Sequence, residues 1–368
     1  MKFNGKTMTV FGQLTTGGCG VETEAGGEIF NDYQNNEAGE FAVAFGSKTK
    51  ATGGASFASG KETTASSNSA HAEGSGTTAE GMASHAEGYK TTSSGDTSHA
   101  EGNGTKASGS HSHAEGYKTT SAGSVSHAEG YCTWASNAYS HVQGKFNVVT
   151  SARTYAHIVG GGTSETDRKN IHTLDWIGNA WFQGTVTSTG ADYAEFFEWA
   201  DGNPSNEDRV GYVVSLDGDK IKLASVGDDV LGVISGTAAI LGDNSGDAWK
   251  KKYMTDDFGR TIYDMTEEFE TEIDPATGKE IQVSVGFYPV PRVNPEFDPS
   301  LEYTPRESRK EWDKVGMFGK LYVRDDSSCT VGGYGCAGEN GVLTHSKERT
   351  NIRIMKRINE SIVLVLMR

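Results

Sequence analysis

Asp192 and Glu195 are two carboxylates whose spacing of three residues suits acid–base chemistry. A turn or the start of a helix would place both side chains on one side of the chain. Two close carboxylates do not both ionise at low cost, so one would act as an acid while the other stays a base. Such a pair could activate a water molecule or protonate the leaving amine of the Ala191–Asp192 peptide bond. The same spacing also fits a structural turn, in which Asp192 caps a helix and Glu195 closes a capping box.

A second set of candidate ligands repeats along the N-terminal half of the chain. Histidines recur every 14 residues, and all but the last stand two residues before a glutamate: His71, His85, His99, His113, His127 and His141, with Glu73, Glu87, Glu101, Glu115 and Glu129. Imidazole and carboxylate are both zinc ligands. A column of glutamates alone would repel itself, and interleaved histidines relieve that repulsion by hydrogen bonding and protonation. We therefore interpret the array as structural and predict no metal and no cofactor, with metal binding as the open alternative.

These histidines belong to a repeat that predicts the architecture of the N-terminal half. Glycines follow the same 14-residue period at Gly46, Gly60, Gly74, Gly88, Gly102, Gly116, Gly130 and Gly144, and a second glycine recurs midway. Two short strands and two tight bends fit this length, with glycine supplying left-handed backbone at the bends. Alternation along a strand puts Ser, Ala and Gly on one face and His and Glu on the other. We predict an all-β protein with a narrow β-roll of 14-residue coils.

Composition and charge exclude some classes of binding partner. The formal net charge of -16 argues against a nucleic-acid partner and against an anionic membrane. No apolar stretch reaches membrane-spanning length, and the first ten residues lack a signal-peptide core, so we expect synthesis in the host cytoplasm. Cys19, Cys132, Cys329 and Cys336 are expected to be thiols, with a Cys329–Cys336 disulfide as the alternative.

The repeat ends after Gly144, and the composition changes after residue 190. One further coil is expected at Thr154–Gly160, and two short strands are expected around Gly178–Asn179. Beyond residue 190, charged, aromatic and aliphatic residues replace the repeat, which indicates a β-rich globular domain. The predicted division is an N-terminal attachment or capping segment (1–37), a β-roll shaft (38–162), a linker with an aromatic β-hairpin (163–191), and a C-terminal domain (192–368).

The repeated Ser-His-Ala-Glu-Gly unit, as in Ser84–Gly88 and Ser126–Gly130, resembles the head repeats of YadA-type trimeric adhesins. The resemblance covers roughly residues 38–162. It implies a left-handed parallel β-roll and a homotrimer. The family pattern has aliphatic residues where this chain has His and Glu.

The run Ala191–Trp199, followed by Asp201–Pro204 and Glu207–Gly211, resembles the peptidase G2 family. These are autocleaving intramolecular chaperone domains at the ends of phage tailspikes and neck-appendage proteins. The resemblance implies that the domain helps three chains assemble and then releases itself. It also implies that the cut falls between Ala191 and Asp192 and that Asp192 and Glu195 carry the reaction. An aspartate-driven cyclisation, which would cut after Asp192, is the mechanistic rival.

From these two resemblances we predict a structural trimeric phage tail or appendage fibre, located in the virion. Its expected partners are its own copies, other phage tail or baseplate proteins and a host cell-surface receptor, with no nucleic acid and no membrane insertion. The alternative is a trimeric adhesin or receptor-binding fibre that does not cleave and keeps its C-terminal domain as a permanent cap. A glycan-degrading tailspike is disfavoured, because the repeated glutamates are too regular for a single active site.

Overall fold

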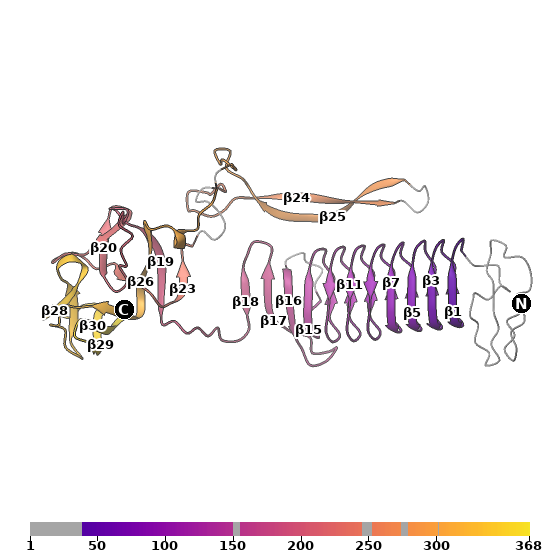
Figure 1. The fold of residues 1–368 in the computed structure, drawn as a ribbon, viewed down its shortest axis with the longest axis horizontal. Helices are drawn as coiled ribbons and strands as arrows, with labels where there is room; N and C mark the ends of the chain where they lie inside the picture. Colours follow the sequence, from indigo (N-terminus) through magenta and orange to yellow (C-terminus); the bar gives the residue numbers. More distant parts are fainter. Residues whose placement is uncertain (1–38, 150–154, 245–251, 274–278, 301) are drawn as a thin grey trace, which may run out of the picture. The chain divides into compact units, whose positions relative to one another are not determined.

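A computed structural model describes residues 39–149, 155–244, 252–273, 279–300 and 302–368 (Figure 1). The predicted N-terminal segment, residues 1–37 with Cys19, lies outside the described residues. The prediction of an all-β protein is confirmed: helix in the described part is limited to two single 3₁₀ turns, Arg306–Ser308 and Glu339–Gly341. The chain divides into two units, residues 1–185 with 264–290 and residues 186–263 with 291–368.

The first unit contains the predicted solenoid, whose coils stack as two parallel sheets (Figure 1). Each residue pairs with the residue 14 positions later, as in His71 with His85 and Gly74 with Gly88, which confirms the predicted register. One sheet contains β1 (Val43–Ser47), β3 (Phe57–Lys61), β5 (His71–Ser75), β7 (His85–Tyr89), β9 (His99–Ala100), β11 (His113–Ala114), β13 (His127–Ala128) and β15 (His141–Lys145). The other contains β2 (Lys50–Ala51), β4 (Thr64–Ala65), β6 (Thr78–Ala79), β8 (Thr92–Ser93), β10 (Lys106–Ala107), β12 (Thr120–Ser121) and β14 (Trp134–Ala135).

The interior of the solenoid is built from small side chains. Columns of alanine are fully buried, for example Ala86, Ala100 and Ala114, and serine and threonine hydroxyls fill the remaining positions. Pairs such as Ser93 and Ser98 share a hydrogen bond of 2.6 Å. Because most of these narrow coils bury little more than methyl groups and hydroxyls, their stability comes from stacking one coil upon the next.

The histidines and glutamates form a half-exposed column on the opposite face, which we call the His/Glu ladder. Consecutive rings from His71 to His141 stack with centroids 4.5–4.8 Å apart. Burial and the neighbouring rings lower the pKa of His85 and of His113. The predicted separation of Ser and Ala from His and Glu is confirmed, but the glycine of the repeated unit, predicted on the small face, is exposed, as at Gly88.

The bends differ from the prediction that glycine supplies their left-handed backbone. Left-handed residues recur at both bends of each coil, but most are not glycine, for example Thr97 (φ 51°) and Lys118 (φ 51°). The glycine of the repeated unit instead adopts φ near +100°, as at Gly102. The midway glycines are there for space: a Cβ on Gly95 would lie 2.0 Å from the carbonyl oxygen of Gly109 in the next coil. At both positions, the glycine of the repeated unit and the midway glycine, glycine is required because the backbones of successive coils stack closely, and not because of the turn itself.

Gly102→Ala should destabilise the solenoid far more than Gly104→Ala does. A Cβ on Gly102 would meet the Gly116 carbonyl oxygen at 2.3 Å, at φ +102°. Gly104 has φ +67°, and the nearest atom to its Cβ is a lysine side-chain carbon at 3.4 Å. We expect a loss of more than about 3 kcal/mol for Gly102→Ala and about 1 kcal/mol for Gly104→Ala. Chemical denaturation followed by circular dichroism measures both, and equal losses would contradict the stacking argument.

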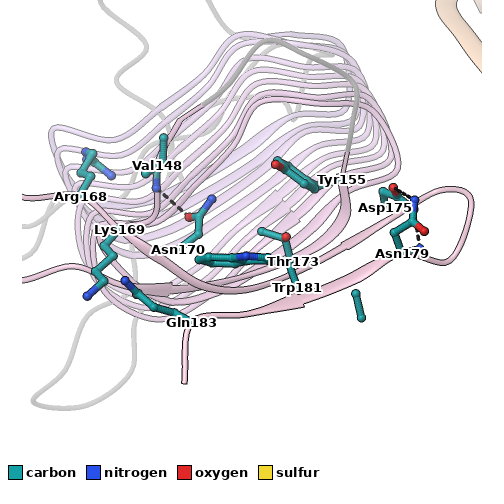
Figure 2. Close-up of a pocket in the computed structure, with 11 residues that line it drawn as sticks. Val148, Tyr155, Arg168, Lys169, Asn170, Thr173, Asp175, Asn179, Trp181 and Gln183 are labelled. Atoms are coloured by element: carbon teal, nitrogen blue, oxygen red, sulfur yellow. Dashed lines mark hydrogen bonds between the residues drawn. The ribbon is translucent and has the colours of Figure 1, made fainter. Parts of the chain in front are cut away.

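The end of the solenoid carries the expected extra coil and hairpin. Strand β16 (Tyr155–Gly161) adds in parallel to β15, with Gly144 opposite Gly160. Antiparallel strands β17 (Asn170–Asp175) and β18 (Ala180–Phe182) then close the sheet. Figure 2 shows the open pocket beside them, about 660 Å³ in volume, with Tyr155, Arg168 and Trp181 among its lining residues.

The second unit is built on one mixed sheet. Its strands are β19 (Asp192–Glu198), β20 (Val213–Asp217), β21 (Lys220–Leu223), β22 (Gly232–Ile234), β23 (Ala238–Gly242), β26 (Trp312–Arg324), β27 (Tyr334–Ala337), β28 (Leu343–Ser346), β29 (Ile352–Asn359) and β30 (Ile362–Met367). Strand β26 is central and pairs with β19, β22 and β30. The core packed against this sheet contains Leu321, Ile352 and Val365.

Separately, β24 (Tyr263–Ile273) and β25 (Glu280–Pro291) pair with each other as a two-stranded sheet.

The described cysteines are free thiols, as predicted. Cys132 and Cys329 are buried, and Cys336 is half-buried without a disulfide to Cys329. Burial raises the pKa of Cys329 to about 12, so this thiol is protonated at neutral pH and unreactive.

Candidate active site

Strand β19 carries both predicted catalytic carboxylates and lies between two other strands. It pairs in parallel with β23 and antiparallel with β26. The preceding residues 183–189 are exposed and belong to no strand, so an accessible loop leads into β19. Ala191 is exposed and Asp192 is 3% exposed. The Ala191–Asp192 bond therefore lies where an accessible chain enters a rigid sheet.

The carbonyl of Ala191 is fixed by the opposite strand. Its oxygen accepts a hydrogen bond from the Lys320 backbone N–H at 3.1 Å. This close approach depends on Gly319, which has φ +116° and on which a Cβ would lie 2.4 Å from the Ala191 oxygen. A backbone donor held in this way can stabilise the negative charge that develops on a carbonyl oxygen during nucleophilic attack.

The carboxylate of Asp192 is buried and only half satisfied. Its Oδ1 accepts a hydrogen bond of 3.3 Å from the Thr237 hydroxyl, whereas Oδ2 has no partner among the described residues. Gly316 leaves the space for Oδ2, because a Cβ there would lie 2.8 Å away. An unpartnered buried polar atom costs about 1–3 kcal/mol and calls for an explanation, of which a catalytic role is one.

Glu195 lies on the other face of the same strand. Its Oε1 accepts a short hydrogen bond from the Tyr193 hydroxyl, and that bond raises the pKa of Tyr193. Both side chains lie over Gly242, on which a Cβ would lie 2.5 Å from the Tyr193 hydroxyl oxygen and 2.9 Å from the Glu195 Cγ. The Tyr193–Glu195 pair is thus separate from the pocket that holds the Asp192 carboxylate.

The expectation of a turn or helix start at Asp192 is therefore wrong, and so is its capping-box alternative. Residues 192–198 form a strand in which buried and half-buried residues alternate, with Asp192, Ala194 and Phe196 on the buried side. Residues three apart in a strand face opposite sides. Within one chain, the structure does not bring the carboxylates of Asp192 and Glu195 together. The catalytic roles of these two residues and the position of the cut remain predictions.

The far end of β19 is held by a cluster of four side chains, which we call the clasp: Trp199, Asp201, Arg209 and Asp313. The Trp199 ring is buried, its Nε1 donates to Asp313 Oδ2 at 3.0 Å, and the Arg209 guanidinium lies 4.3 Å from the ring centroid. Asp201 accepts two hydrogen bonds from Arg209, at 3.0 and 2.7 Å, which lower the pKa of Asp201. Burial raises the pKa of Asp313. The clasp fixes the strand in place and lies away from the Ala191 carbonyl in sequence and in strand register.

Comparison with known proteins settles the family. The model of the peptidase G2 family, described as the IMC autoproteolytic cleavage domain, matches residues 141–360. The chain belongs to this family. The match includes the whole of β19 and the Ala191–Asp192 bond, and it confirms the relationship predicted from the run Ala191–Trp199. The likeness of the repeats to YadA-type heads stays a prediction.

Curated relatives come from bacilli and their phages. The chain is 35% identical over 214 residues to the putative phage-related protein YobO of Bacillus subtilis (strain 168), covering 52% of this chain and 24% of YobO. It is 34% identical over 187 residues to the pre-neck appendage protein of Bacillus phage B103, covering 50% of this chain and 20% of that protein. This chain therefore spans about a quarter or less of the length of these relatives.

A solved structure extends the likeness to most of the chain. The crystal structure of the pre-mature bacteriophage phi29 gene product 12 superposes with a TM-score of 0.55 at 26% sequence identity, covering 87% of this chain and 39% of that one. Separately, no helix within the described ranges is both long and apolar enough to span a membrane.

Proposed function

We propose that this chain is part of a trimeric phage appendage fibre whose residues 192–368 act as an intramolecular chaperone and are released by self-cleavage between Ala191 and Asp192. Membership of the peptidase G2 family and the likeness to pre-neck appendage proteins support this proposal. The fibre would reside in the virion, with its own copies, other tail or baseplate proteins and a host receptor as partners.

The observation that carries the proposal is the pairing of a fixed carbonyl with a half-satisfied carboxylate. The Ala191 oxygen is held by the Lys320 N–H, and the next residue, Asp192, buries an oxygen with no partner among the described residues. In the proposed reaction, water attacks the Ala191 carbonyl carbon and the oxyanion is stabilised by the Lys320 N–H. Asp192 delivers a proton to its own departing backbone nitrogen. The products are an Ala191 carboxylate and a free amino group on Asp192.

Glu195 would then act from a neighbouring chain, taking the proton from the attacking water. The strand geometry supports this arrangement, because Glu195 and Asp192 of one chain face opposite sides of β19. A water that must be activated by a second chain attacks only after assembly, which would delay release of the chaperone domain until three chains have met.

Mixed trimers of two inactive variants test this arrangement. Asp192→Asn and Glu195→Gln chains, distinguished by different N-terminal tags, are expressed together and separately and then weighed by intact-mass spectrometry. Each variant alone should stay uncut. In mixed trimers, the Glu195→Gln chain keeps its own Asp192 and gains a neighbour's Glu195, so this chain alone should be cut after Ala191.

The controls separate the two parts of the proposal. Wild-type chain that remains a single full-length species in stable trimers would overturn self-cleavage and leave a fibre with a permanent cap. Wild-type chain that is cut while mixed trimers stay intact would instead place both carboxylates in the same chain. Cutting after Asp192 would favour aspartate-driven cyclisation.

A further inference from the structure

In the His/Glu ladder, the Glu73 carboxylate lies between two imidazole rings, at ion-pair distance from both and hydrogen-bonded to neither. Its Oε2 lies 3.9 Å from the Nε2 of His71, and its Oε1 lies 3.9 Å from the Nε2 of His85. One ligand atom from each of the three residues lies within 4.8 Å of the others. Two nitrogen donors and one carboxylate therefore lie close together on the solenoid face.

These distances leave the ring nitrogens unsatisfied. A separation of 3.9 Å is too long for a hydrogen bond. The Nε2 atoms of His71 and His85 are both shielded from solvent and have no partner among the described residues. The other end of the ladder is different, because His141 Nε2 lies 3.2 Å from Glu129 Oε1 and forms a hydrogen bond. A purely structural ladder would be expected to close in the same way along its whole length.

We propose that His71, Glu73 and His85 bind a divalent transition-metal ion of the zinc class. Zn²⁺ binds imidazole nitrogen and carboxylate oxygen at about 2.0–2.2 Å, so two ligands of a tetrahedral ion lie roughly 3.3 Å apart. The two rings stack almost parallel, with centroids 4.5 Å apart and an interplanar angle of 13°, so both would rotate out of the stack to bring their Nε2 atoms to one ion. All three side chains are half-exposed and have room to rotate. The Phe57 ring lies edge-on to His71, with ring centroids 4.9 Å apart. A tetrahedral ion would take its fourth ligand from water.

The donor set also selects the class of ion. Two imidazoles and one carboxylate suit Zn²⁺, Co²⁺ or Ni²⁺, whereas Mg²⁺ and Ca²⁺ prefer oxygen ligands alone. His71 and His85 belong to successive coils, β5 and β7, so the ion would tie one coil to the next. Its binding energy would add to the coil stacking that holds the solenoid together.

Three other groups along the ladder have the same kinds of donor: Glu87 with His99 and Glu101, Glu101 with His113 and Glu115, and His127 with Glu129 and His141. Two of these groups share Glu101 and offer only one imidazole each. The third already has a hydrogen bond between His141 and Glu129 that a metal must replace. The first site, with two unpartnered nitrogens, should therefore bind most tightly.

Zinc titration of the full chain tests the site. Protein stripped with EDTA is titrated with ZnCl₂ in a calorimeter, bound ions per chain are counted by native mass spectrometry, and MgCl₂ serves as the oxygen-preferring control. We expect wild-type chain to bind zinc and not magnesium, and to unfold at a higher temperature with zinc than with EDTA. The double variant His71→Gln/His85→Gln should bind one ion fewer per chain and lose the tightest binding phase, with affinity falling by about 100-fold or more.

His111→Gln is the matched control, because His111 is an exposed histidine of the same solenoid outside the ladder. It should bind as many ions as wild-type chain. If the double variant fails to fold, the nearly isosteric Glu73→Gln variant provides the test. It should also bind one zinc ion fewer per chain than wild-type chain does. Wild-type chain that binds no zinc, or a folded ladder variant that binds as much zinc as His111→Gln does, would overturn the proposal.

Discussion

Asp192→Asn should yield a folded chain that stays at full length, with the rate of cleavage lowered by about 100- to 10,000-fold, the range expected for loss of a general acid. Asn has nearly the same shape as Asp and still accepts the Thr237 hydrogen bond through its amide oxygen. Its amide cannot deliver a proton to the departing nitrogen as a carboxylic acid does. Intact-mass spectra taken over a time course after purification give the rate directly.

Two carboxylates of the same domain provide matched controls for this variant. Glu198 lies on the same strand and pairs with Lys220 at 2.6 Å, so Glu198→Gln removes a charge from β19 without changing the Asp192 pocket. Asp313→Asn removes a buried charge but keeps an oxygen that can accept the Trp199 hydrogen bond, so the clasp should stay in place. Both should still be cut at close to the wild-type rate. If Asp192→Asn were cut as fast as these controls, Asp192 would be a structural residue and its unpartnered oxygen would need another explanation.

The solenoid could be predicted from sequence because the length of the repeat determines the register of its strands. A period of 14 residues fixes which side chains stack, so the alanine columns and the His/Glu ladder follow from alternation alone. The backbone at the bends could not be read in the same way. Left-handed positions such as Thr97 and Lys118 show no residue preference, since coil-to-coil hydrogen bonds hold them in place.

The candidate site could be predicted from sequence only in part, because most of its residues come from distant strands. Asp192 and Ala191 were found in the motif, but Thr237 and Lys320 reach them from the residue before β23 and from β26, and no spacing in the sequence ties these residues together. The turn assumed at Asp192 was wrong because β19 is paired on both sides, and this pairing overrides the local capping pattern. The two glycines inside β26, Gly316 and Gly319, were the available signal, since glycines within strands often mark close backbone approach.

Gly319→Ala is the second change expected to have a large effect, because it acts on the carbonyl that water attacks in the proposed reaction. Gly319 has φ +116°, and its new methyl group would lie 2.4 Å from the Ala191 oxygen and 2.9 Å from the Asp192 Cα. These atoms must separate, which breaks the 3.1 Å hydrogen bond from the Lys320 N–H. We expect cleavage to slow by about 100-fold or more, the effect typical of losing one oxyanion donor.

The strain that any side chain adds at a positive φ must be distinguished from the effect of Gly319→Ala on the Ala191 carbonyl. Gly218→Ala provides the comparison, since Gly218 has φ +67° in the β20–β21 turn and a Cβ added there would have no atom within 4 Å. It should lose about 1 kcal/mol of stability and keep the wild-type cleavage rate. Unfolding curves and intact-mass time courses on both variants give the two quantities independently. A Gly319→Ala chain that folds and is cut at the Gly218→Ala rate would show that the Lys320 N–H does not assist the reaction. The rate of cleavage would then have to depend on activation of the attacking water instead.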